Sequence, residues 1–174
     1  FCVYDLTQFL SFLNMYGDGE LEVDNTNVTF KQGRRSTKYR LTNETQIVTP
    51  PQKTLTLPSV DCSFTLSSED YDWVLRAASV LSSPQIAIES DGKKITIVTI
   101  DLQNDSAHTD ALEISEGNGD KYRMVFKTEN ISKILSGSYD VSISSKGVSH
   151  FKHKTQPLQY WVTTEQGSKF EKGA

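Results

Sequence analysis

The sequence predicts an α+β fold in which helices cover one face of antiparallel sheets. An apolar triplet with the spacing i, i+3, i+4 recurs three times, and this spacing puts three side chains on one stripe of a helix. Each triplet follows residues that commonly cap a helix and precedes segments rich in Val, Ile, Thr and Tyr. The triplets start 65 and 60 residues apart, which indicates an internal repeat. They are Leu6, Phe9 and Leu10; Tyr71, Val74 and Leu75; and Ile131, Ile134 and Leu135.

The first helix is predicted over residues 5–16, because Asp5 can cap its start and Gly17 can end it. Strands separated by turn-forming residues should follow. They are predicted near 20–24, 27–32 and 36–42.

Residues 43–61 differ in character from the segments on either side. Pro50, Pro51 and Pro58 interrupt any regular element, while the rest of the stretch stays apolar. We interpret this stretch as an extended connector that lies on a surface, since it lacks the Gly and Ser of a flexible linker.

The second half of the chain repeats the same plan. A strand at 62–66 leads into a helix at 68–82, and a third, shorter helix at 129–136 is expected to end at Gly137. The polar tail from Gln166 is expected to fray. Further strands are predicted near 85–90, 94–101, 110–116, 121–127, 138–144, 148–153 and 158–164.

Composition narrows the function. The 174 residues carry a net charge of −4, which argues against a protein held to DNA or to an anionic membrane by bulk charge. A protein that holds DNA by its shape is not excluded. No apolar run approaches the roughly 20 residues of a membrane span.

The sequence offers no group that we would nominate as catalytic, so we expect no enzyme and no cofactor or metal. His150 and His153 lie three residues apart, and on a strand this odd spacing points them to opposite faces, so we interpret them as surface residues. Glu69, Asp70 and Asp72 could suggest acid–base chemistry, but at a helix start carboxylates cap backbone amides.

The helix faces opposite the apolar stripes are more informative. With 100° per residue, Trp73, Arg76 and Val80 point away from the core on the second helix, and Lys133 does so on the third. Trp73 and Val80 are unusual residues for a solvated face, so this face is expected to contact a binding partner.

Several short stretches, in their order and spacing, carry a family resemblance. They are Val3-Tyr4-Asp5-Leu6 with Phe9-Leu10, Glu69-Asp70 before Val74-Leu75-Arg76, Asp91-Gly92-Lys93-Lys94-Ile95, Asn104-Asp105-Ser106-Ala107 and Gly137-Ser138-Tyr139. With them the chain resembles the DNA polymerase sliding clamps, or processivity factors, of T-even-type tailed phages.

The resemblance implies a subunit of two domains, each with two helix-plus-strands units, and a ring of three subunits with helices lining the hole. This chain has three such units. By resemblance, residues 1–46 are the second half of clamp domain one, with its first half missing. Residues 47–61 are then the interdomain connector and residues 62–174 are clamp domain two.

The implied function is to encircle duplex DNA without sequence preference and to tether the replicative DNA polymerase for processive synthesis. The resemblance also implies a clamp loader, a role in late transcription and a place in the cytoplasm of an infected bacterial host. The intact protein should be a homotrimer, and this chain alone a monomer or a dimer.

Two sets of site residues follow from the resemblance. Arg76 and Lys133, with Trp73, would face the DNA. A partner peptide would dock in an apolar pocket beside the connector, unless the pocket residues instead fill the seam between the domains. The pocket residues are Ile47, Val48, Leu55, Leu57, Pro58, Tyr160 and Val162. The alternative function is a non-enzymatic phage structural or accessory domain rich in strands, which would not explain the repeated helices.

Overall fold

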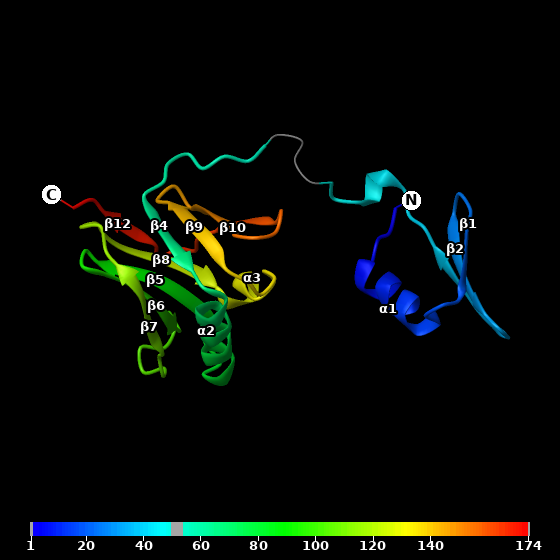
Figure 1. The fold of residues 1–174 in the computed structure, drawn as a ribbon, viewed down its shortest axis with the longest axis horizontal. Helices are drawn as coiled ribbons and strands as arrows, with labels where there is room; N and C mark the ends of the chain where they lie inside the picture. The colour runs from blue at the N-terminus through cyan, green and yellow to red at the C-terminus, as the bar shows by residue number, and fades with distance from the viewer. Residues whose placement is uncertain (1, 50–53, 174) are drawn as a thin grey trace. The chain divides into compact units, whose positions relative to one another are not determined.

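The computed structural model describes residues 2–49 and 54–173, and it confirms the α+β class (Figure 1). The chain divides into two compact units, Phe1–Thr54 and Leu55–Ala174. This division falls inside the predicted connector, of which Pro50 and Pro51 lie outside the described residues. That residues 1–46 are half of a clamp domain stays a prediction.

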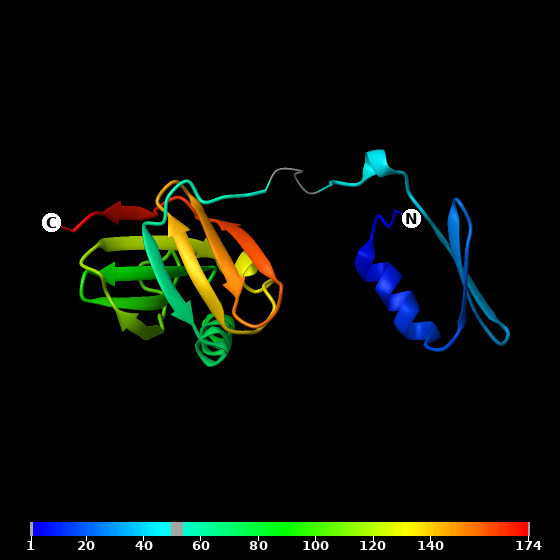
Figure 2. The same cartoon turned by 45° about the horizontal axis from the view of Figure 1, so that its top comes forward.

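The first unit consists of one α-helix that packs on an antiparallel sheet with the strand order β1-β2-β3 (Figure 2). The Asp5 side chain accepts a hydrogen bond from the Gln8 amide at the helix start, and Gly17, with φ +49°, ends the helix. A short 3-10 helix, Glu44–Gln46, follows the sheet. The elements are α1 Leu6–Tyr16, β1 Glu20–Val23, β2 Asn27–Gln32 and β3 Arg35–Arg40.

The predicted core stripe of α1 is wrong. Leu6 and Leu10 are exposed, at 60% and 47%, whereas Phe9 and Tyr16 are buried. The buried face therefore follows the spacing i, i+3, i+7 through Phe9, Phe12 and Tyr16. This face is aromatic, and its Phe9 packs edge-on against aromatic rings of β2 and β3, which gives directed contacts that leucines would not provide.

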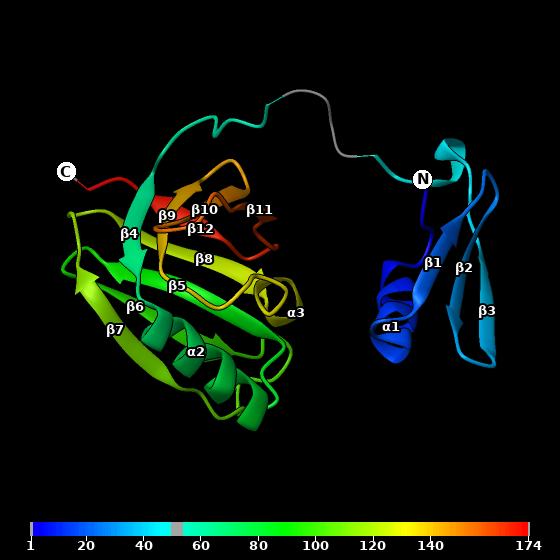
Figure 3. The same cartoon turned by 45° about the vertical axis from the view of Figure 1, so that its right-hand side comes forward.

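The second unit packs two antiparallel sheets around one core, and α2 and α3 lie beside them (Figures 1 and 3). The four-stranded sheet has the order β11-β10-β9-β4, and the five-stranded sheet has the order β12-β8-β5-β6-β7. The strands are β4 Cys62–Leu66, β5 Gln85–Asp91, β6 Lys94–Ile100, β7 Ala111–Glu116, β8 Lys121–Lys127, β9 Tyr139–Ser144, β10 Val148–His153, β11 Gln159–Thr163 and β12 Lys169–Glu171.

Helix α2, Ser68–Val80, buries the predicted stripe. Tyr71 and Val74 are buried, and Leu75 packs against the same core. The helix begins at the Ser67 cap, whose hydroxyl oxygen accepts a hydrogen bond from the Asp70 amide at 3.1 Å.

Helix α3 is shorter than predicted, spanning Thr128–Ile131 rather than 129–136. The chain continues in tighter turns, because the Ile134 amide donates to the Ile131 carbonyl three residues back. Ile131 and Ile134 are nevertheless buried as predicted, while Leu135 is half exposed.

The tail does not fray as predicted. Strand β12 pairs antiparallel with β8, and Phe170 stacks on Tyr122 with ring centroids 6.4 Å apart. This strand could not be predicted from the polar composition of the tail, because Phe170 is its residue that packs against the core.

Candidate functional site

Helix α2 carries an unusual exposed face. The side chains of Trp73 and Val80 are 51% and 77% exposed, and Arg76 is exposed between them. The sheets cover the opposite face of the helix, so these three residues lie where the helical period predicted.

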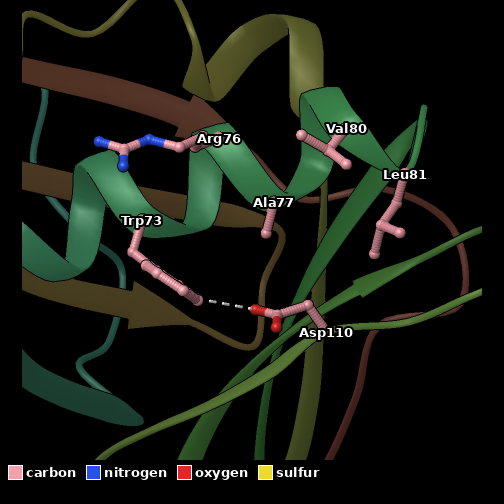
Figure 4. Close-up of a pocket in the computed structure, with 6 residues that line it drawn as sticks. All are labelled: Trp73, Arg76, Ala77, Val80, Leu81 and Asp110. Carbon is pink, nitrogen blue, oxygen red and sulfur yellow. Dashed lines mark hydrogen bonds between the residues drawn. The ribbon is translucent and has the colours of Figure 1, made fainter.

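The exposed face borders a groove of about 260 Å³ (Figure 4). The Trp73 indole turns toward the start of β7, and its Nε1–H donates a hydrogen bond to Asp110 Oδ2 at 3.2 Å. Asp110 is itself held in place, because its amide donates to Thr99 Oγ1 at 2.9 Å. Arg76 extends away from Asp110 (Figure 4). The groove is lined by Trp73, Arg76, Ala77, Val80, Leu81 and Asp110.

Lys133 lies just after α3, on a neighbouring part of the surface. Its Nζ pairs with Glu129 Oε1 at 2.8 Å, and both side chains are largely exposed. The Lys133 ammonium holds the pKa of the Glu129 carboxyl below its usual range. Solvent screens an exposed pair of this kind, so Glu129 restrains Lys133 only weakly.

Two contacts join α2 to the segment around α3. The buried Tyr71 hydroxyl lies 2.9 Å from the carbonyl oxygen of Ile131 and 2.6 Å from that of Ile134. Ser136 Oγ donates to Asp72 Oδ1 at 2.7 Å. Arg76 and Lys133 are thus carried on adjacent, tied elements, but whether they face DNA stays a prediction.

The predicted pocket residues are distributed over both units. Ile47 and Val48 belong to the first unit, where Val48 is 98% exposed. Leu55, Leu57 and Pro58 belong to the second unit, and of these Leu57 is the most buried.

Tyr160 and Val162 lie on β11, at the opposite edge of the four-stranded sheet from β4, into which the connector leads. They line a depression of about 350 Å³ together with Lys133. The second unit therefore places these two residues beside a predicted DNA-facing lysine, and their membership of the peptide pocket stays a prediction.

The residues set aside as non-catalytic have structural roles. The hydroxyl of Ser67 donates to Asp70 Oδ2 at 2.6 Å, which completes the cap of α2. His150 stacks on Trp161, with ring centroids 4.3 Å apart. His153 is not a surface residue as predicted, because it is 8% exposed and its Nδ1 accepts hydrogen bonds from the amides of Thr155 and Gln156. In residues 2–49 and 54–173 no group of three or more His, Cys, Asp or Glu side chains is placed to hold a metal ion.

Three residues of the groove, Ala77, Leu81 and Asp110, were not predicted from the sequence. A signal for the first two exists, because Trp73, Ala77 and Leu81 are spaced i, i+4, i+8 and so form a second apolar stripe along α2 and its C-cap residue. Asp110 lies 37 residues from Trp73 in the chain, and only the packing of β7 beside α2 brings the two together.

Comparison with known structures supports the fold. The DNA polymerase III beta subunit of Borrelia burgdorferi matches with a TM-score of 0.60 at 12% identity, over 92% of this chain and 45% of the other. A beta sliding clamp of Caulobacter crescentus gives 0.61 at 12% identity, over 92% and 44%. A Helicobacter pylori beta clamp bound to a DNA ligase peptide gives 0.57 at 11% identity, over 84% and 40%. The chain spans less than half of the length of these bacterial proteins.

Comparison of sequences shows the family. The sliding clamp of Vibrio phage KVP40 is 30% identical over 171 residues, which cover 95% of this chain and 76% of that protein. Residues 63–166 match the family described as gp45 sliding clamp, C terminal. These matches confirm the resemblance found in the sequence and do not favour a phage structural domain. The chain therefore belongs to the gp45 sliding clamp family.

Proposed function

We propose that this chain acts as a sliding clamp, which encircles duplex DNA and tethers the replicative DNA polymerase during synthesis. The observation that carries the proposal is that Arg76 on α2 and Lys133 just after α3 both lie exposed, and that Tyr71 ties α2 to the segment around α3. This arrangement comes in a chain of the clamp family whose net charge is negative.

A clamp of this charge holds DNA by topology rather than by affinity. A few lysines and arginines at the lining surface attract phosphates without reading bases, which permits sliding. The carboxylates of Asp72 and Glu129 on the same segments keep that attraction weak. The protein in this proposal performs no catalysis.

The proposed assembly is a homotrimeric ring in which subunits meet head to tail. A clamp loader opens the ring on DNA in the cytoplasm of the infected bacterial host. The partner surface is the connector, where Leu55 and Leu57 meet a short apolar peptide of the polymerase. In residues 2–49 and 54–173, no helix has the length and apolar character needed to cross a membrane.

The DNA-facing assignment is tested with Arg76→Gln and Lys133→Gln in one protein. Synthesis is measured on primed circular templates of two sequences over a range of salt concentrations, with polymerase and clamp loader present. We expect shorter products on both templates, because phosphate contacts carry no sequence information. The slope of log affinity for DNA against log salt should fall in magnitude by about 2, one for each phosphate that the variant no longer neutralises.

Lys152→Gln is the matched control, since Lys152 is an exposed lysine on β10 rather than on a helical segment. Its products should have the wild-type length. Wild-type products from the double variant at every salt concentration would show that the helix faces are assigned wrongly.

A further inference from the structure

The connector is pinned to the second unit at its C-terminal end by Asp61. The Oδ2 atom of Asp61 accepts a hydrogen bond from the Ser145 amide at 2.7 Å and another from Ser59 Oγ at 2.7 Å. The Asp61 amide donates to the carbonyl of Ile143 at 3.0 Å, so the backbone there already follows β9.

A fourth residue extends this network into the core. The hydroxyl oxygens of Ser59 and Ser144 lie 2.7 Å apart, and Ser144 is fully buried. Because the Ser59 proton goes to Asp61, the Ser144 hydroxyl donates to Ser59, and Ser144 Oγ accepts from the Lys146 amide at 3.2 Å. We call Ser59, Asp61, Ser144 and Ser145 the connector clip.

The clip is made for an ionised carboxylate. Hydrogen bonds from the Ser145 amide and the Ser59 hydroxyl, with a smaller attraction from the Lys146 ammonium, hold the pKa of Asp61 below its usual value. A charged acceptor strengthens both hydrogen bonds, and polarisation along the chain of two hydroxyls reinforces them.

The clip lies next to the proposed partner surface. Ser59 follows Pro58, whose ring fixes its own φ, and Pro58 follows the half-buried Leu57. The connector clip begins two residues after Leu57 in the chain, so it fixes the position of Leu57 from its C-terminal side. Leu55, four residues before Ser59, stays 48% exposed for contact with a partner.

We propose that Asp61 is a positioning residue for peptide binding: through the connector clip it holds Leu57 and Leu55 in the arrangement that a partner peptide recognises. This inference rests on the proposed function, in which the connector binds the peptide. Without the clip the connector samples other conformations, and the apparent dissociation constant rises by the inverse of the competent fraction. The cost appears in the association rate, since the contacts of the bound state are unchanged.

The test compares three variants of the full chain, Asp61→Ala, Asp61→Asn and Leu57→Asp. NMR relaxation reports the order of residues 55–60, and stopped-flow measurements report binding of a fluorescent peptide with the C-terminal sequence of the phage's replicative polymerase. Asp61→Ala should lower the order of the connector and weaken binding about tenfold, if the competent fraction falls to about one tenth. The loss should lie in the association rate. Asp61→Asn should restore most of the affinity, because its amide oxygen can accept both hydrogen bonds.

Asp91→Ala is the matched control for loss of stability. Asp91, like Asp61, accepts two hydrogen bonds in a turn, here from the amides of Lys93 and Lys94, but it lies at the end of β5. This variant should leave the peptide affinity unchanged.

The outcomes separate the two proposals. If Leu57→Asp weakens binding and Asp61→Ala does not, the positioning role is overturned and the peptide surface stands. A connector that stays ordered in Asp61→Ala also overturns the positioning role. If neither variant changes the affinity, the connector is not the peptide surface and both proposals fail.

Discussion

The hydroxyl of Tyr71 on α2 lies 2.6 Å from the carbonyl oxygen of Ile134, beyond the end of α3. A helix leaves its last carbonyl groups without partners in the helix, and a buried carbonyl without a partner is costly. Tyr71 supplies the donor from the neighbouring helix, so the short α3 can end inside the core. The same contact ties together the two segments that carry Arg76 and Lys133.

Removal of this hydroxyl should destabilise the second unit. Tyr71 is 2% exposed, so Tyr71→Phe keeps the ring packing and leaves the Ile134 carbonyl without this donor. We expect a loss of about 1–3 kcal/mol in the free energy of unfolding, measured by urea denaturation. Tyr4→Phe is the control, because Tyr4 is 77% exposed. Equal stability of the two variants would mean that the contact contributes nothing.

Alkaline pH should destabilise the protein from about pH 9 upward, before the tyrosines of an unfolded chain ionise near pH 10. Burial raises the pKa of the Cys62 thiol from 9.0 to about 12 and that of Tyr71 from 10.0 to about 12. Both groups are neutral when protonated, and the unfolded chain releases these protons at lower pH than the folded chain does. The stability is therefore fully present below pH 9 and falls as the pH rises toward 12, by about 1.4 kcal/mol per pH unit for each proton.

The Cys62 contribution can be isolated by Cys62→Ala. The stability of this variant should begin to fall near pH 10 rather than near pH 9, because only the buried tyrosines then contribute to the pH dependence. Urea denaturation at a series of pH values gives both curves. Curves of the same shape would show that the thiol titrates alike in both states.

The turn between β1 and β2 should contain an unusually acidic carboxyl. Hydrogen bonds from the amide and hydroxyl of Thr26, followed by the Asn27 amide, lower the pKa of Asp24 from 3.8 to about 2. Its contribution to stability is present above pH 3.8 and is lost as the pH falls through about 2. A ¹³C NMR titration of the carboxyl should show this midpoint, and Thr26→Ala should raise it. An ordinary midpoint in the unaltered chain would contradict the turn geometry.

The buried face of a helix can be predicted from the sequence when its apolar residues lie on a single stripe. The stripe of α2 is correct, because Tyr71, Val74 and Leu75 are apolar among polar neighbours. The prediction fails on α1, which is apolar on several sides, so that only the aromatic rings of β2 and β3 select Phe9 over Leu6 and Leu10.

The candidate site likewise contains features that the sequence predicts and features that it does not. The exposure of Trp73 and Val80 follows from helical geometry, and both are exposed as predicted. The groove does not follow, since Asp110 comes to Trp73 only through the packing of β7 beside α2. The connector clip joins residues about 85 positions apart, and no local pattern reports such a contact.

Trp73 itself provides a last test, because it is predicted to face DNA while its indole is turned toward Asp110. In a Trp161→Phe background Trp73 is the remaining tryptophan of the chain, so its fluorescence reports the groove alone. If α2 lines the hole, loading of the clamp on closed circular duplex should reduce quenching of Trp73 by acrylamide. Asp110→Ala should increase quenching in the free protein, because the Nε1–H loses its 3.2 Å partner and the ring becomes free to swing outward. Protection that is already complete in the assembled ring without DNA would place the groove at a subunit contact, and Trp73 would then be removed from the set of DNA-facing residues while Arg76 remained in it.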